Sequence, residues 1–228
     1  TLYCFGGRYL SEDGRTATLN SPQFVDAFEY CTKLVWDGCA MNGVQSRKDG
    51  IKCWHALVQE LAAMNVAGDW AYGHATRTLK ETGKEWRPEM YLLPSGPGGR
   101  HPCQASKGHS AYSGTKKKDA VMAWMKFSFT KEFQEVQARN YGIAPVFPGR
   151  LDAGQPVFDQ KLLPDIFGDL FEGSIPVPKS PLMSVDSIFT YLGDAADAIW
   201  KRTDTRPIKT ILDDINKRVQ DELDAAAE

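Results

Sequence analysis

The pattern of hydrophobic and polar residues predicts long helices at both ends of the chain. After Asn20-Ser21-Pro22, apolar residues recur at helical spacing as far as Val35, and Asp37-Gly38 ends the segment. The serine oxygen is expected to cap the first turn, in which proline presets the backbone. Towards the other end, helices are predicted over Ser184 to about Trp200 and over Pro207 to Ala226, the second with one continuous apolar stripe.

The spacing of apolar residues changes from that of a helix to that of a strand in the segment before Gly68-Asp69. A helix is predicted from Asp49 to about Gln59. Ala62, Met64 and Val66 then alternate with their neighbours, which is the period of a strand. Gly68-Asp69 closes this run, and a helix is predicted from Trp70 to about Thr82. The order strand, turn, helix places Trp70 at the head of a helix.

The next stretch mixes extended segments with helices. A helix from Asp119 is apolar over much of its circumference and is expected to be well buried, and Thr130 is expected to cap a further helix to about Arg139. The glycine-rich loop of residues 95–100 is expected to be a plain turn. Beyond Pro148 the chain becomes helical with proline-rich connectors, and a helix is predicted over Leu162 to Phe171. Three short extended segments are predicted: Pro88 to Pro94, Ser110 to Ser113 and Tyr141 to Val146.

Composition narrows the possible functions. The net charge of -2 gives no basic surplus, so no nucleic-acid partner is expected. No apolar run approaches the roughly 20 residues of a membrane span. The first residues lack the basic start and apolar core of a signal peptide. The five cysteines form no CxxC pair, so they indicate no particular compartment.

Motifs for catalysis or for cofactor binding do not stand out. Cys53 and His55 flank Trp54, and side chains so close along a helix diverge too far to form a catalytic pair. His101, Cys103 and His109 lie in one loop, but a fourth zinc ligand is missing. No catalytic residue, metal or cofactor is therefore predicted.

Aromatic residues are the remaining resource for binding. Six tryptophans, eight tyrosines and eleven phenylalanines are present, and aromatic faces stack on the apolar faces of sugar rings. Core packing is the better interpretation for any one tryptophan. Trp70 is the exception, because a side chain between a strand end and a helix start lies where open α/β sheets bind their ligands.

Five segments, in this order, resemble the later half of a known family. They read TATLNSPQFVDAFEYCTKLVWDG, LAAMNVAGDW, MYLLPSGPGGR, KKKDAVMAWMKFSFTKEFQEVQARNYGIAPVF and PIKTILDDINKRVQDELDAA. The family is that of the extracellular solute-binding proteins of bacterial ABC importers, and the branch is the one that binds sugars, oligosaccharides and polyols, which includes maltose-binding protein. The resemblance covers nearly the whole chain, although Gln59-Glu60 stands where the family usually has a glycine.

The resemblance implies an α/β fold of the periplasmic-binding-protein-like type II, with two lobes, crossing hinge segments and a helical carboxyl-terminal part. Residues 1–87 would form part of lobe 2, residues 88–146 the crossing strands and part of lobe 1, and residues 147–228 the helical remainder of lobe 2. Family members are about twice as long as this chain. The resemblance therefore implies either that the amino-terminal half of the protein is missing here or that the fold is rearranged.

The resemblance also implies a set of ligand-binding residues in the cleft between the lobes. Trp70 would stack on the ligand, and Asp69 would accept a hydrogen bond from a hydroxyl group. The family's glycine-rich strand start falls near residues 107–109, and an aromatic from the helix near residues 189–191 would reach the cleft. The implied set is Asp69, Trp70, Lys107, Gly108, His109, Phe189 and Tyr191.

The function implied is capture of a sugar or related solute and its delivery to an ABC permease, outside the cytoplasm and without catalysis. The partners would be a carbohydrate, the transmembrane permease subunits and the missing amino-terminal half. Two alternatives stay open. A glycoside-processing enzyme needs two carboxylates across a cleft, and only Asp69 is placed for that role. A fragment that binds no ligand is the other.

Overall fold

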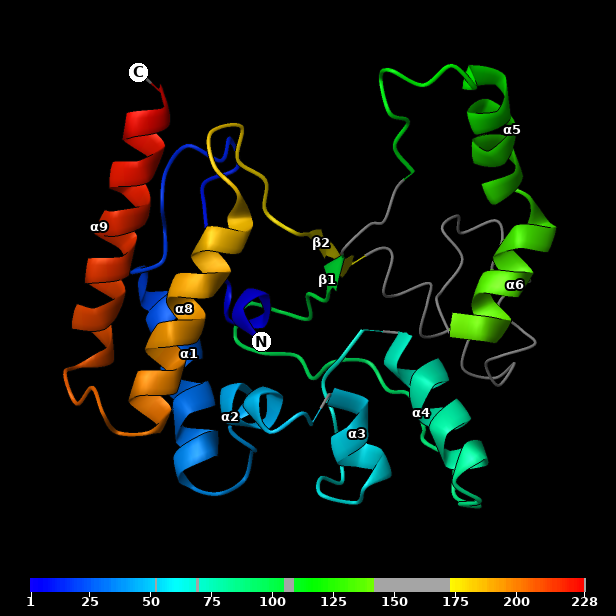
Figure 1. Ribbon diagram of the computed structural model, residues 1–228. Helices are drawn as coiled ribbons and strands as arrows, with labels where there is room; N and C mark the ends of the chain where they lie inside the picture. Colours follow the sequence, from blue (N-terminus) through cyan, green and yellow to red (C-terminus); the bar gives the residue numbers. More distant parts are fainter. Residues whose placement is uncertain (52, 69, 105–108, 142–172, 228) are drawn as a thin grey trace. The chain divides into compact units, whose positions relative to one another are not determined.

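The computed structural model describes residues 1–228 except 52, 69, 105–108, 142–172 and 228 (Figure 1). The chain divides into two compact units that are each built from separate segments. Unit 1 comprises Thr1–Ile51, Leu93–Gln104 and Ser174–Glu228, and unit 2 comprises Lys52–Leu92 and Ala105–Gly173. The backbone therefore passes from one unit to the other after residues 51, 92, 104 and 173.

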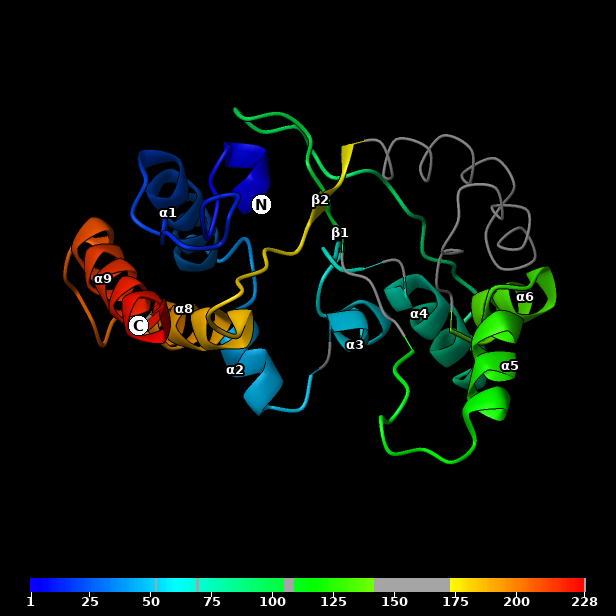
Figure 2. The same cartoon turned by 90° about the horizontal axis from the view of Figure 1, so that it is seen from above.

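Unit 1 is built around three long helices that pack against one another: α1 (Pro22–Trp36), α8 (Val185–Trp200) and α9 (Ile208–Ala227). Two views show α8 and α9 side by side (Figures 1 and 2). The short helices η1 (Leu2–Phe5) and α2 (Gly43–Lys48) pack on α1 and α8. A parallel pair of two-residue strands, β1 (Cys103–Gln104) and β2 (Ile175–Pro176), aligns Cys103 with Ile175.

The core of unit 1 joins the apolar faces of these helices to the loop that precedes α1. Burial of each large aliphatic side chain stabilises the folded state by about 1.5–3 kcal/mol. The apolar stripe predicted for the last helix is the one that α9 buries. The completely buried aliphatic residues of this cluster are Leu19, Ile188, Leu212, Val219 and Leu223.

Two polar side chains of α9 also fasten the loop before α1. The backbone amide of Leu19 donates to Asn216 Oδ1 at 2.7 Å, and the amide of Ala17 donates to Gln220 Oε1 at 2.9 Å. These amides would otherwise be buried without an acceptor, because no ladder of a sheet receives them. Side chains of a helix thus replace the partner that a strand would have supplied.

The ends of these helices confirm most of the predicted boundaries. The helix starts at Pro22, Val185 and Ile208 lie within a residue of those predicted. Ser184 accepts a hydrogen bond from the amide of Asp186. The predicted cap by Ser21 is wrong, since its buried hydroxyl makes no hydrogen bond and the amides of the first turn bond to its backbone carbonyl instead.

The glycine-rich loop is a tight turn, as the sequence predicts, and it lies against η1. Gly96 and Gly99 exchange two backbone hydrogen bonds of 3.0 Å, and Gly98 donates to the carbonyl of Cys4 at 2.7 Å. A Cβ atom on Gly98 would lie 2.4 Å from the amide nitrogen of Gly6. Glycine is needed here because only a bare backbone can approach another backbone so closely.

Unit 2 contains α3 (Cys53–Val58), α4 (Trp70–Glu81), α5 (Lys118–Ser128) and α6 (Lys131–Tyr141). The contacts join α3 to α4, α4 to α6 and α5 to α6. The ammonium group of Lys84 donates to the carbonyl of Val58 at 2.8 Å, which satisfies an orphan carbonyl at the end of α3. A small core consists of Val58, Ala75 and Leu79, with Trp54 and Trp86 packed against it.

The strands predicted in unit 2 are wrong for the described residues. Residues 62–66 and 110–113 form no strand, and the exposed fractions of Met64 and Tyr112 are 88% and 79%. Alternation specifies a strand only when another strand takes its hydrogen bonds, and the described part of unit 2 offers none.

Two helical predictions also need correction. The helix expected over Asp49 to Gln59 is broken at Gly50, which has a φ of 76° and ends α2, and α3 begins at Cys53. The helix expected to be well buried is α5, yet the exposed fractions of Met122 and Trp124 are both 51%. Its apolar circumference exceeds the face that α6 can cover.

Other predictions concern residues that the structure does not describe. The extended segment at Tyr141 to Val146 lies outside the described residues apart from Tyr141, which ends α6. The helix predicted over residues 162–171 lies wholly outside them. The lobe boundaries at residues 87 and 147 stay a prediction. No helix among the described residues is long and apolar enough to cross a membrane.

Candidate functional site

Trp70 is the first residue of α4, as the sequence predicts, and its side chain is half-buried. Its indole meets the ring of Trp54, with centroids 5.6 Å apart and planes at 90°. Trp54 also stacks on the imidazole of His74 at 4.7 Å with an angle of 17°. Trp54, Trp70 and His74 therefore form one group of rings, here called the aromatic corner.

Local sequence explains why these three rings meet. Trp70 and His74 are four residues apart, so they share one face of α4. Trp54 approaches that face from α3, whose contact with α4 is fixed by the core around Leu79. A Cβ atom on Gly68 would lie only 2.4 Å from Trp70 Nε1, so the indole lies against a glycine that leaves it room.

The aromatic corner offers the two kinds of contact that a sugar needs. The face of an indole such as that of Trp70 can stack on the apolar C–H surface of a pyranose, and the imidazole of a histidine can donate or accept a hydrogen bond to a hydroxyl group. His55, whose ring lies 5.1 Å from that of Trp54, adds a second imidazole. The described groups are suited to holding a neutral polar ring.

His109 lies in a different part of unit 2. It is exposed, and its ring meets the edges of Trp124 at 6.1 Å and Phe133 at 6.4 Å. No ring contact joins it to Trp70 within the described chain. A hollow of about 410 Å³ opens beside it at the start of α5, lined by His109, Ser110, Thr115, Lys117, Ala120, Val121, Trp124 and Met125.

Phe189 and Tyr191 lie on α8 in unit 1. Phe189 packs on Tyr9 with centroids 5.3 Å apart, and its exposed fraction is 41%. The hydroxyl of Tyr191 donates to Glu222 Oε1 at 2.6 Å, which raises the pKa of that tyrosine. The guanidinium of Arg218 lies 3.7 Å above the same ring. Tyr191 is thus already engaged by α9.

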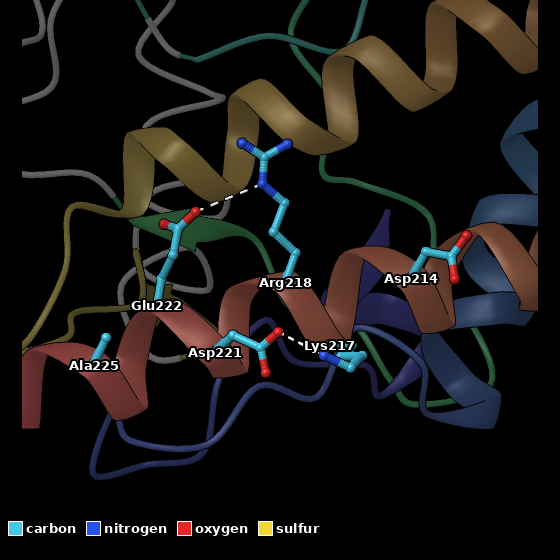
Figure 3. A pocket seen from close by; sticks show the side chains of 6 residues that line it. All are labelled: Asp214, Lys217, Arg218, Asp221, Glu222 and Ala225. Atoms are coloured by element: carbon cyan, nitrogen blue, oxygen red, sulfur yellow. Dashed lines mark hydrogen bonds and ion pairs between the residues drawn. The ribbon is translucent and has the colours of Figure 1, made fainter.

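A second hollow, of about 420 Å³, lies over α9 (Figure 3). All of its lining residues come from this one helix, and the close view shows Arg218 paired with Glu222 and Lys217 with Asp221. Exposed pairs four residues apart are ordinary on a solvated helix face. This hollow therefore offers no convergent set of ligand-binding groups.

The remaining residues singled out from the sequence add no further binding group to the described part of the chain. Asp69, Lys107 and Gly108 lie outside the described residues. His101 bonds through its ring to the carbonyl of Gly98 at 3.0 Å, and Cys103 lies in β1. No group of three potential metal ligands occurs in the part of the chain that the structure describes.

Sequence reasoning placed Trp70 at the head of α4 but did not indicate its two ring partners. The four-residue spacing of Trp70 and His74 was a readable signal, because it puts both rings on one helical face. Trp54 gave no such signal, since its contact with Trp70 depends on how α3 and α4 pack.

Comparisons with solved structures show the fold. The chain is 18% identical to the GacH receptor of Streptomyces glaucescens, with a TM-score of 0.73. The match covers 98% of this chain and 55% of the receptor. The identity to the maltose-binding protein MalE of Listeria monocytogenes is 18% and the TM-score is 0.67, and the match covers 98% of this chain and 56% of that one. The identity to the maltose/maltodextrin-binding domain MalE of Bdellovibrio bacteriovorus is 20% and the TM-score is 0.66, and the match covers 98% of this chain and 55% of that one.

The predicted fold class is confirmed by these matches: the chain has the fold of the periplasmic binding proteins that resemble maltose-binding protein, and it spans about half the length of those solved structures. A comparison with curated proteins finds no match. The model of the family described as bacterial extracellular solute-binding protein matches residues 1–163. The protein belongs to the bacterial extracellular solute-binding protein family.

Proposed function

We propose that this protein captures a sugar, an oligosaccharide or a related polyol, with the indole of Trp70 as a stacking platform. The observation that carries the proposal is the position of that indole, which is half-buried at the head of α4 and held edge to face by Trp54. A ring held in this way is preorganised, so little conformational entropy is lost when a ligand stacks on it.

The solved structures support a carbohydrate as the ligand. The GacH receptor was solved with acarbose, the Listeria protein with maltose and the Bdellovibrio domain with maltotriose. All three are glucose-derived or glucose-like oligosaccharides. Family and neighbours are described as binding proteins or receptors, which supports binding without catalysis.

Delivery to an ABC permease outside the cytoplasm is the second part of the proposal. The family description as extracellular supports the location. In this mechanism the ligand stabilises a closed form of the two lobes through its higher affinity for that form, and the closed form docks on the permease.

A companion amino-terminal half that completes the cleft is the third part. Two observations support it: the chain covers 55% of the GacH receptor, and α5 leaves large apolar side chains such as Trp124 exposed. The intact mass of the protein, purified from its natural source, tests this part. A mass of 25.4 kDa without a bound polypeptide would contradict it.

Isothermal titration with maltose, maltotriose and acarbose tests sugar capture. Trp70→Ala is expected to raise the dissociation constant at least about tenfold, because it removes the stacking surface. Trp36→Ala is the matched control, since Trp36 is another partly exposed tryptophan and lies in unit 1 beneath Arg202. Equal affinities of Trp70→Ala and the unaltered protein would remove Trp70 from the site.

A further inference from the structure

We propose that Trp54 and Gly68 are positioning residues that fix the plane of the Trp70 indole. Neither residue is assigned a contact with the ligand. They act on the ring that the proposed function uses as its platform, and only the predicted effect on sugar affinity rests on that function. The inference follows from three features of the aromatic corner.

The first feature is the contact between the two indoles. Their planes are perpendicular at a centroid separation of 5.6 Å, which is the edge-to-face geometry that aromatic quadrupoles favour. Such a pair stabilises the arrangement beyond the area that it buries. Rotation of Trp70 about its side-chain torsions would lose this contact, so the perpendicular arrangement opposes rotation.

The second feature is that Trp54 is itself held in place. It packs against the small core around Val58 and Leu79, and one of its faces stacks on His74 at 17°. His74 follows Trp70 by one helical turn on α4, and their rings are 6.1 Å apart. Trp54 therefore connects the Trp70 indole to the core of unit 2 and holds it in position relative to that core.

The third feature is the glycine two residues before Trp70. A Cβ atom on Gly68 would lie 2.4 Å from Trp70 Nε1 and 2.8 Å from Cδ1. The backbone of Gly68 does not adopt the left-handed conformation, so alanine would cause no backbone strain there. Its main effect would be to push the indole away from its present position.

These features divide the roles within the corner. Trp54 limits rotation of the indole through its edge-to-face contact, and Gly68 leaves the space that the ring occupies. Fixing a ring before the ligand arrives increases affinity, because fewer rotamers are lost on binding. A variant that frees the ring should weaken binding even though Trp70 is still present.

Fluorine NMR of protein labelled with 5-fluorotryptophan reports the position of Trp70 directly. Six resonances are expected, one for each tryptophan, and the one absent from Trp70→Phe belongs to Trp70. In Trp54→Leu and in Gly68→Ala, this resonance should narrow and move towards the position of free fluorotryptophan. Trp54→Phe keeps an aromatic edge and should restore much of the original position.

Two matched controls separate positioning from general destabilisation. Trp86→Leu removes a tryptophan that packs against the same core as Trp54 but has no ring contact with Trp70 among the described residues. Gly43→Ala adds a methyl group where nothing lies within 4 Å. Both controls should leave the Trp70 resonance in place, whatever they do to the midpoint of unfolding.

Titration with maltotriose supplies the second measurement. Trp54→Leu and Gly68→Ala should each raise the dissociation constant about fivefold, and Trp86→Leu and Gly43→Ala should leave it unchanged. An unmoved Trp70 resonance in both Trp54→Leu and Gly68→Ala overturns the positioning roles, as does an equal shift in Trp86→Leu. If the unaltered protein binds no maltotriose, the proposed function fails for this ligand, and the resonances still decide the inference.

Discussion

Unit 1 and unit 2 differ in how completely they bury their own apolar residues. In unit 1, the stripe of α9 meets α1 and α8, and Leu212 and Ile188 have no exposed surface. In unit 2, α5 contacts α6 but leaves about half of Met122 and of Trp124 exposed. Large exposed apolar patches mark surfaces that bind something. The described part of unit 2 leaves such side chains exposed on α5, whereas the apolar stripe of α9 in unit 1 is covered by its own helices.

The largest expected effect comes from removing side-chain volume from the buried core of unit 1. Leu212→Ala should lower the free energy of unfolding of unit 1 by about 2–5 kcal/mol, because it leaves a cavity in a packed interior. Met122→Ala on α5 should change the stability of unit 2 by no more than about 0.5 kcal/mol. Hydrogen exchange followed by mass spectrometry in increasing urea measures both units separately. Equal losses in the two variants would abolish the contrast.

A smaller effect is expected from the polar fastening of the loop before α1. Asn216→Ala should destabilise unit 1 by about 1–3 kcal/mol, because the buried amide of Leu19 loses its acceptor. Asn216→Asp keeps an oxygen in place and serves as the control. Urea unfolding followed by circular dichroism measures the change. A loss in Asn216→Asp as large as in Asn216→Ala would assign the effect to packing instead.

The smallest effect is a loss of folding stability at alkaline pH, and it is confined to unit 1. Burial raises the pKa of Tyr9 from 10.0 to about 12. A raised pKa in the folded state means that stability is complete below pH 10 and falls as the pH rises from 10 to 12, where only the unfolded chain ionises readily. Tyr9→Phe should remove this part of the decline.

Hydrogen exchange of unit 1 between pH 9 and pH 12, corrected for the intrinsic exchange rate, measures the decline as an order-of-magnitude change in protection. Tyr112→Phe is the control, because Tyr112 is exposed and lies in unit 2. The same decline in Tyr9→Phe and in the unaltered protein would assign the alkaline loss to another group.

The same contrast explains which parts of the fold were readable from the sequence. The period of 3.6 residues located α1, α4, α8 and α9 to within a residue or two, because an amphipathic helix satisfies its backbone internally. The alternation around Met64 predicted a strand and failed, since a strand depends on a neighbour that a local pattern does not contain. The burial predicted for α5 failed for a related reason: an apolar surface shows that a partner is needed, not that one is present.

The candidate site was predictable only in part. The order of glycine and Trp70 before a helix marked the residue of interest, and the structure shows that glycine to be where a side chain would collide with the indole. Trp54 could not be found in the same way, because its distance from Trp70 in the sequence carries no period. The ligand-binding roles that stay predictions are those of Asp69, Trp70, Lys107, Gly108, His109, Phe189 and Tyr191.

The interleaving of the two units in the sequence has a practical consequence for biochemistry. The backbone passes between the units after residues 51, 92, 104 and 173. A single proteolytic cut at any one of these connections would therefore leave unit 1 and unit 2 joined through the other connections. Neither half is encoded by a contiguous stretch, so truncation at either end removes material from within a unit and does not excise one. Excision would require stitching distant fragments together with artificial linkers.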